Sequence, residues 1–371
     1  MKKEIIRKRI HVLREKLKDL QQDTIWVLQP ENRRYLSGFN ASDLLFTESS
    51  GSLLITEKTS LLVTDSRYTL EAEREAVDFE VVTLKKGLVE SLPGLLSDLG
   101  TRHLGFEEGY VTWEAHKRIL QGLRKLAPRP TLTPLKGLIE DMREIKAPEE
   151  IRLLQASSDL MSKILASVIP RIEPGRMEKE IAWEIADRAR DGGAEGLAFP
   201  SIVASGPNSA LPHAAPTNRK IRTGEPITLD VGVRVEGYCC DMTRTIFLDE
   251  PKREFAKIYR IVRDAQLAAL EKVRPGVEST LPDATARDMI RDEGFGDYFG
   301  HSLGHGVGLE PHERPRLGPQ KPVQLKEGMV VTVEPGIYLP GKGGVRLEHM
   351  VAITKDGARI LTKDNHFYDF R

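Results

Sequence analysis

Residues 229–245 read LDVGVRVEGYCCDMTRT, and this stretch decides how the second half of the chain folds. Valines occupy every second position from 231 to 235, as expected of a strand with one buried face. The dipeptide Glu236-Gly237 follows and suits a two-residue turn, after which the chain returns through Tyr238. The pattern therefore predicts a β-hairpin.

Two aspartates share one face of this predicted hairpin. Pairing across the turn places Asp230 opposite Thr243 and Gly232 opposite Asp241, so the two acids become diagonal neighbours. Like charges at such a distance repel each other unless a cation or a shared proton compensates them. A divalent metal ion is one compensation. A solvated hairpin whose acids face water is the alternative, and this pair of acids alone leaves it open.

The composition excludes several classes of protein. With 371 residues, 40% of them hydrophobic and 30% charged, the chain is long enough for two folded domains. Its 55 basic and 55 acidic side chains cancel, which gives no electrostatic argument for a nucleic acid or an anionic membrane as a partner. The charged N-terminal stretch lacks the apolar core of a signal peptide, and no apolar run of about 18 residues follows. The two cysteines, Cys239 and Cys240, are adjacent, which argues against a structural disulfide and for a reduced compartment. We therefore expect a cytoplasmic protein.

The N-terminal part alternates between helix and strand patterns, which predicts an α/β domain. A helix is expected over residues 5–20, and the runs SLLIT and SLLVTD are expected to pair as a hairpin. Three prolines between residues 128 and 134 then interrupt the pattern. We expect a domain boundary there, with one domain over residues 1–133 and a second over residues 134–371. The first long helix of the second domain is expected to begin at Pro148.

The second domain contains an internal repeat. IEPG at 172–175 matches VRPG at 273–276, and TGEPITLDVG at 223–232 matches KEGMVVTVEPG at 326–336. The second match aligns Asp230 with Glu334. Chance agreement of turn residues is the alternative, but several matches at nearly one offset favour a duplicated helix-plus-sheet unit around a pseudo-twofold axis. Such a duplication would point acids from both halves at one centre.

The second half supplies further candidate ligands. Glu334 ends the apolar run MVVTVE, and Glu348 returns in VRLEHMVAIT after the turn LPGKGG. An unpaired carboxylate within such apolar runs is costly, and metal ligation would remove that cost. Between the halves, the glycine-rich segment GHSLGHGVGLEPHERPR contains His301, His305 and His312. A single histidine is commonly structural, but three within twelve residues indicate a site.

With these motifs the chain resembles the metallopeptidases of pita-bread fold, which include methionine aminopeptidase, aminopeptidase P and prolidase. The resemblance rests on LDVG, DMTRT, GHGVGL, VEPGIY and RLEHMVAIT. The N-terminal motifs PENRRYLSGF and TDSRY resemble the creatinase-type domain of prolidases and aminopeptidases P, which favours these two over methionine aminopeptidase. The resemblance implies a creatinase-type α/β domain followed by an α+β pita-bread catalytic domain with internal pseudo-twofold duplication.

The resemblance also implies a site with two divalent metal ions. The five-ligand pattern of the family falls on Asp230, Asp241, His305, Glu334 and Glu348, and none is missing, which argues against creatinase itself. Asp241 and Glu348 would bridge the ions, with Asp230 on one ion and His305 and Glu334 on the other. Such an oxygen-rich set suits manganese or cobalt better than a structural zinc, although zinc remains an option. A water between the ions would be the nucleophile and Glu334 its proton shuttle.

Other residues are assigned supporting roles. By the same resemblance, His213 in SGPNSALPHAAP and His312 would bind substrate and stabilise the tetrahedral intermediate. Arg346 and Thr243 would orient ligands, although a surface ion pair is the alternative for Arg346. His301 would line the pocket for the amino end of the substrate, or only hold its loop.

Arg316 bears on the choice of substrate. It corresponds to a position where archaeal prolidases carry an arginine suited to binding a free carboxylate, and a solvated loop arginine is the alternative. We therefore expect an Xaa-Pro dipeptidase acting on proline-containing peptides, with an Xaa-Pro aminopeptidase as the alternative. A non-catalytic binding protein of the same fold is a more distant alternative, because such relatives lose metal ligands and this chain keeps all five. The family further implies a homodimer.

Overall fold

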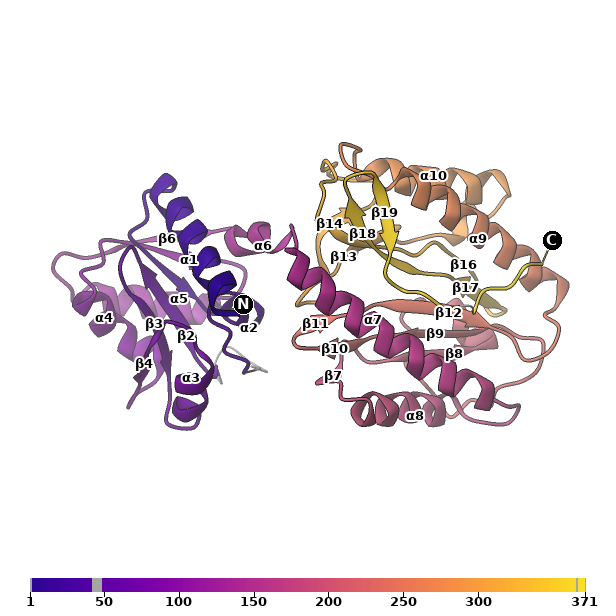
Figure 1. Ribbon diagram of the computed structural model, residues 1–371, viewed down its shortest axis with the longest axis horizontal. Helices are drawn as coiled ribbons and strands as arrows, with labels where there is room; N and C mark the ends of the chain where they lie inside the picture. The colour runs from indigo at the N-terminus through magenta and orange to yellow at the C-terminus, as the bar shows by residue number, and fades with distance from the viewer. Residues whose placement is uncertain (1, 42–48, 365, 371) are drawn as a thin grey trace. The chain divides into compact units, whose positions relative to one another are not determined.

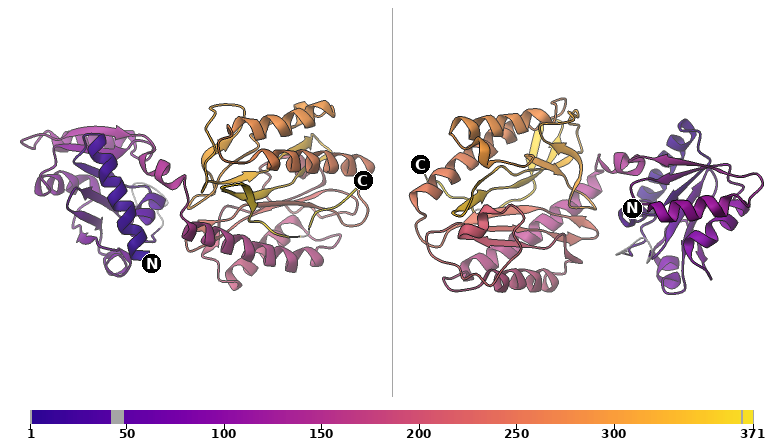
Figure 2. Two further views of the ribbon diagram at one scale, coloured as in Figure 1. Left: turned by 45° about the horizontal axis from the view of Figure 1, so that its top comes forward. Right: turned by 180° about the vertical axis from the view of Figure 1, so that it is seen from behind.

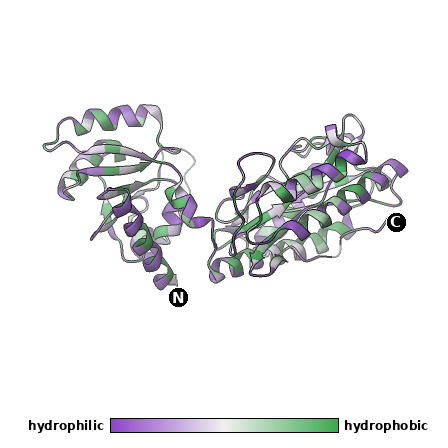
Figure 3. Ribbon diagram, turned by 90° about the horizontal axis from the view of Figure 1, so that it is seen from above, coloured by the Kyte–Doolittle hydropathy of each residue, from purple (hydrophilic) through white to green (hydrophobic). Residues whose placement is uncertain are grey.

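The computed structural model describes residues 2–41, 49–364 and 366–370, which form two compact units (Figure 1). The first unit is Met1–Met142 and the second is Arg143–Arg371. In both units the helices alternate between hydrophobic and hydrophilic residues, as helices that cover a sheet must (Figure 3). No helix of the described residues combines the length and apolarity that a membrane span requires.

The first unit is built on a six-stranded mixed sheet of order β4-β3-β2-β1-β5-β6. Its strands are β1 (Thr24–Val27), β2 (Ser52–Thr56), β3 (Ser60–Thr64), β4 (Glu80–Thr83), β5 (His103–Glu107) and β6 (Thr131–Leu135). Its helices are α1 (Lys2–Asp19), α2 (Pro30–Ser37), α3 (Thr69–Glu75), α4 (Leu88–Asp98) and α5 (Trp113–Leu123), and α6 (Leu138–Arg143) leads out of the unit. Strands β2 and β3 pair antiparallel, which confirms the predicted hairpin, and the α/β class of this domain is confirmed as well.

Strand β6 was not expected from the sequence. The proline-rich segment that we interpreted as an interruption continues the sheet, since Pro134 pairs in parallel with Phe106 of β5. Proline cannot donate a ladder hydrogen bond, and β6 tolerates it because it is an edge strand. The sheet thus extends beyond residue 133, and the compact units divide after Met142.

The second unit consists of strands between two pairs of helices (Figures 1 and 2). The helices are α7 (Pro148–Val168) and α8 (Glu178–Asp191) on one side, and α9 (Arg253–Lys272) and α10 (Thr280–Asp292) on the other. The strands of the first half are β7 (Gly196–Leu197), β8 (Ile202–Ser205), β9 (Ile227–Val231), β10 (Val233–Val235), β11 (Tyr238–Cys239) and β12 (Met242–Ile246). Those of the second are β13 (Gly304–Gly306), β14 (Glu313–Leu317), β15 (Val330–Val333), β16 (Gly336–Leu339), β17 (Gly343–Arg346), β18 (His349–Thr354) and β19 (Gly357–Ile360). Helix α7 begins at Pro148, as predicted.

The predicted duplication is visible in matched backbone details. Helices α8 and α10 lie at equivalent places in the two halves, and the turns before them contain Gly175 and Gly276, both with positive φ (95° and 80°). Each turn also donates to a matched carbonyl, since Gly175 N bonds Ile221 O at 2.9 Å and Gly276 N bonds Leu325 O at 2.8 Å. The two halves therefore repeat one helix-plus-sheet unit, in agreement with the pita-bread fold.

Candidate metal centre

The hairpin of the first half forms with the predicted register. Val235 pairs with Tyr238 beside the turn, and Asp230 pairs with Thr243 further along. Glu236 and Gly237 both have positive φ (45° and 87°), as a two-residue hairpin turn of the primed type requires. The local sequence therefore determines this part of the site.

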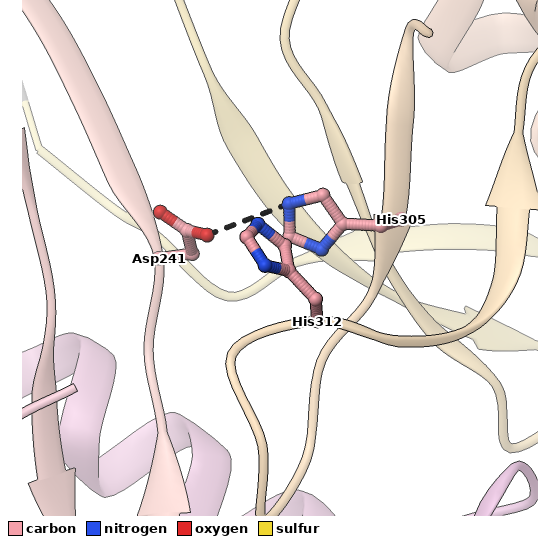
Figure 4. A group of neighbouring side chains, drawn as sticks. All are labelled: Asp241, His305 and His312. Carbon is pink, nitrogen blue, oxygen red and sulfur yellow. Dashed lines mark ion pairs between the residues drawn. The ribbon is translucent and has the colours of Figure 1, made fainter. Parts of the chain in front are cut away.

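Asp241 lies where the hairpin loses its regular ladder. Gly232 separates β9 from β10, and a side chain there would overlap the carbonyl oxygen of Cys240 and the ring of Phe199. Only glycine permits this close approach of the two chains. Asp241 is buried, and it projects toward His305 of the second half (Figure 4).

Glu334 and Glu348 face each other at a second interruption. Val333 pairs with His349 on one side and Gly336 with Arg346 on the other, so the same register passes through both glutamates. The run VRLEHMVAIT belongs to two strands, with Leu347 and Glu348 between β17 and β18. Because neither glutamate belongs to the ladder, both side chains can turn inward.

Five residues from both halves meet at one place, and we call this set the cage: Asp230, Asp241, His305, Glu334 and Glu348. Ligand atoms of Asp230, Asp241 and Glu348 all lie within 4.8 Å of one another. His305 Nε2 lies 3.2 Å from Glu334 Oε1 and 3.6 Å from Asp241 Oδ2. His305 Nδ1 is 3.0 Å from the Gly306 carbonyl, and donation there leaves Nε2 directed at the acids.

The pKa values in the cage show a strong excess of negative charge. Burial first, and then repulsion by the neighbouring carboxylates, raises the pKa of Asp241 and of Glu348 well above the usual range. Burial also raises the pKa of Asp230, although Arg346 opposes this shift. Burial alone would raise the pKa of Glu334, but the hydrogen bond and charge of His305 outweigh burial and lower it to about 2.

Two residues outside the cage orient its acids. Arg346, 3% exposed, donates from Nη2 to Asp230 Oδ2 at 2.6 Å and from Nε to Thr243 Oγ1 at 3.2 Å. Thr243 Oγ1 in turn donates to Glu348 Oε2 at 2.8 Å. Both residues were predicted to support ligands, and the surface ion pair considered for Arg346 does not apply because the guanidinium is buried.

One oxygen of the cage has no hydrogen-bond partner in the described part of the chain. Glu348 Oε1 is buried and accepts no hydrogen bond from the described residues. A buried carboxylate oxygen without a partner is costly, and a cation would remove that cost. The residues present thus fit a divalent metal, because the donors are hard oxygens and one imidazole and the group is short of positive charge.

Two supporting residues were missed in the sequence. Tyr338 accepts a hydrogen bond from Arg346 Nη1 at 2.9 Å and lies 2.8 Å from His301 Nε2, which links the histidine to the cage. Thr332 Oγ1 accepts from the His305 backbone and donates to Glu334 Oε1 at 3.1 Å. The only signal for either was the strand period, since residues 332, 334, 336 and 338 would share a face of a regular strand.

Of the remaining predicted residues, His312 contacts the cage directly. The ring of His312 packs edge-on against that of His305, with 4.2 Å between the ring centroids. One nitrogen of His312 lies within 4.8 Å of ligand atoms of His305 and Asp241 (Figure 4). Burial, then the charge of His305, and to a smaller extent that of His213, lowers the pKa of His312, so His213 lies within electrostatic range. His301 and Arg316 line one pocket of about 350 Å³, and Arg316 pairs across strands with His305.

Comparison with protein families matches both units. Residues 152–355 match the model of metallopeptidase family M24, and residues 9–145 match the creatinase/prolidase N-terminal domain. The chain is 36% identical over 342 residues to an Xaa-Pro dipeptidase from Pyrococcus horikoshii, covering 92% of this chain and 93% of the relative.

Solved structures agree with this match. An Xaa-Pro dipeptidase from Bacillus anthracis superposes with a TM-score of 0.90 at 36% identity, over 97% of this chain and 98% of the other. An X-Pro aminopeptidase from Thermotoga maritima superposes with a TM-score of 0.84, also at 36% identity, over 95% and 98% of the two chains. A structure named as a dipeptidase and one named as an aminopeptidase are thus equally similar to this chain in sequence.

Proposed function

Because the chain belongs to metallopeptidase family M24, we propose that it hydrolyses the peptide bond before proline with two divalent cations held by the cage. The single observation that carries this proposal is the convergence of Asp230, Asp241 and Glu348, one of whose carboxylate oxygens, Glu348 Oε1, has no hydrogen-bond partner among the described residues. Asp230, Asp241, His305, Glu334 and Glu348 would hold these cations. Manganese or cobalt suits this donor set best.

The cations and the side chains around them would have separate roles in the reaction. When bound, the cations would polarise the scissile carbonyl and lower the pKa of the attacking water. Glu334 is ionised at neutral pH and can take a proton from that water and pass it to the proline nitrogen as the bond breaks. The exposed His213 and His312 would contact the peptide and donate to the developing oxyanion.

We propose a dipeptidase rather than an aminopeptidase, on the basis of Arg316. Arg316 pairs across strands with His305, and its side chain lines a pocket together with His301, which supports a role in binding the free carboxylate of a dipeptide. An Xaa-Pro aminopeptidase is the second candidate, because a relative of that activity is equally similar. We also propose that the protein is cytoplasmic and that it forms a homodimer. Light scattering would test the homodimer.

The test uses purified protein treated with chelator and reloaded with Mn²⁺. We expect release of free proline from Xaa-Pro dipeptides, no activity with chelator, and weak cleavage of Xaa-Pro tripeptides. Arg316→Ala should raise the KM for dipeptides and leave the KM for tripeptides unchanged. Preference of the parent for tripeptides would favour the aminopeptidase, and no cleavage of either peptide by metal-loaded protein would favour a binding protein.

A further inference from the structure

The loop that carries His213 has little regular structure of its own. It runs from residue 206, where the short 3₁₀ helix Gly206–Ala210 begins, to residue 217 before β9. Leu211 and His213 at its tip are exposed. A histidine that must meet a substrate from such a loop depends on how the two ends of the loop are fixed.

Both ends of this loop are held by one carboxylate. Glu178, the first residue of α8, is fully buried. At the start of the loop its Oε1 accepts from Ser205 N at 2.7 Å, from Ser205 Oγ at 2.8 Å and from Asn208 Nδ2 at 3.1 Å. At the end its Oε2 accepts from Thr217 N at 3.0 Å and from Thr217 Oγ1 at 2.6 Å. Asn208 Nδ2 also lies 3.0 Å from Oε2, so this amide contacts both oxygens, whereas the backbone N–H groups of Ser205 and Thr217 bind different oxygens.

Backbone hydrogen bonds secure the end of the loop separately. The first turn of α8 donates from Glu178 N to Arg219 O and from Lys179 N to Thr217 O, both at 3.1 Å. The start has no such backbone bond to α8 among the described residues. The Glu178 side chain is thus the group through which α8 reaches both ends.

The second half of the unit repeats the arrangement. Asp283 in the first turn of α10 is buried and accepts from Leu303 N at 2.9 Å, just ahead of His305. Its partner Arg287 donates to the carbonyl of His301 at 2.8 Å. In both halves, then, a buried carboxylate at the start of the second helix anchors a segment with site histidines.

We propose that Glu178 is the positioning residue of His213, which it holds beside the metal centre by tying the two ends of loop 206–217 together. The kinetic part of the inference rests on the proposed function, because it is measured by Xaa-Pro hydrolysis. The structural part does not.

The replacement Glu178→Gln tests the tie with almost no change in volume. Each oxygen of Glu178 accepts a hydrogen bond from a backbone N–H. In either orientation of the glutamine side chain, its NH₂ group therefore faces one of these donors, Ser205 N–H or Thr217 N–H, and that hydrogen bond is lost. We expect kcat/KM for Xaa-Pro dipeptides to fall by up to about 100-fold, as when a reacting group is displaced by about 1 Å. Hydrogen exchange within 206–217 should accelerate at least about tenfold. Manganese affinity should not change, because the cage lies on other elements.

A matched control is available on the same helix. Glu184 forms ion pairs with Arg171, Arg176 and Arg188 and is not bonded to the loop. Glu184→Gln should leave kinetics and loop exchange as in the parent. If Glu178→Gln does not fold, Thr217→Val serves as the second variant. It removes one hydrogen bond to Glu178, together with those that the Thr217 hydroxyl accepts from Asn208 Nδ2 and Arg219 N, and should give a smaller change of the same kind.

A double-mutant cycle separates positioning from a general structural effect. In a His213→Ala background, Glu178→Gln should cost no more than about twofold further in kcat/KM, because the residue it positions is already absent. A full additional loss, or unchanged exchange in 206–217, would overturn the proposal. If the parent cleaves no Xaa-Pro peptide, the proposed function fails, and the exchange of the loop alone decides for or against the tie.

Discussion

The second unit contains two buried groups of acids that are neutralised differently. Glu313, beside His312, lies 3.0 Å from Lys146 Nζ and pairs with Arg143, which also binds Glu310 at 2.9 Å. We call Arg143, Lys146, Glu310 and Glu313 the charge cluster. Burial alone would raise the pKa of Glu313, but Lys146 and Arg143 outweigh burial and lower it to about 2.

The cage lacks this internal balance. It gathers four carboxylates around Arg346 and His305, and the pKa values of Asp241 and Glu348 are raised. A carboxylate with a lowered pKa is stabilised by its own protein, whereas one with a raised pKa holds its charge at a cost. The acids of the charge cluster therefore stabilise the fold, whereas Asp241 and Glu348 of the cage need a cation to compensate their charge.

The largest expected effect concerns catalysis by the cage. Asp241→Asn should reduce Xaa-Pro hydrolysis at saturating Mn²⁺ by about 10⁴-fold, equivalent to about 5 kcal/mol, because a neutral amide would hold a divalent cation more weakly than a carboxylate. Metal content measured by elemental analysis should fall as well. Glu236→Gln at the exposed turn of the same hairpin is the control and should retain activity. Activity of Asp241→Asn within tenfold of the parent would contradict the assignment of the cage.

The second prediction concerns the folding stability of the charge cluster. Glu313→Gln leaves Lys146 and Arg143 buried without their shared carboxylate, which should cost roughly 3–5 kcal/mol of unfolding free energy. Urea unfolding in chelator measures this loss. Asp241→Asn should show no loss under the same conditions, because it removes a repelled charge. Equal losses in the two variants would show that the two groups do not differ in the way described.

A smaller effect is expected from Arg346→Lys. Lysine keeps the charge but cannot reach Asp230, Thr243 and Tyr338 at once as the guanidinium does. Manganese affinity should therefore fall about 10- to 100-fold, as when a group that orients metal ligands is lost. Calorimetric titration measures the affinity. An unchanged affinity would mean that charge alone, and not the hydrogen bonds of Arg346, holds the cage.

Much of the cage could be predicted from sequence because it depends on local patterns. The strand period and the turn Glu236-Gly237 gave the register that brings Asp230 and Asp241 together. The repeat then identified Glu334 as the counterpart of Asp230. These inferences hold because a hairpin register depends on few neighbouring residues.

Other parts depend on contacts between distant segments and have no local signal. The strand interruption at Glu348 follows from packing against β12, shown by the hydrogen bond from Glu348 N to Thr243 O. The charge cluster joins Arg143 to Glu313 across 170 residues, which no periodicity reveals. Strand β6 was missed because its proline suggested a break, whereas an edge position permits it.

The last prediction concerns pH and needs its sign worked out. In the metal-free protein the raised pKa values of Asp241 and Glu348 mean that the folded state binds more protons than the unfolded state at weakly acidic pH. Their contribution to stability therefore increases as pH falls from neutrality. The lowered pKa of Glu313 has the opposite sign, and its contribution is lost only as pH falls below about 4.5 toward about 2.

Comparing variants in chelator between pH 7.5 and pH 5 isolates this effect. Asp241→Asn should be more stable than the parent at pH 7.5, and its advantage should shrink toward pH 5 as Asp241 of the parent takes up a proton. The deficit of Glu313→Gln should stay constant over the same range. His349, whose pKa is lowered to about 3 by burial and by Arg244, destabilises all variants equally toward acid and cancels in the differences. With excess Mn²⁺ the parent should instead lose stability as pH falls, because protons compete with the metal for the cage. An advantage of Asp241→Asn that does not vary with pH would show that Asp241 is not the strained acid that this comparison requires.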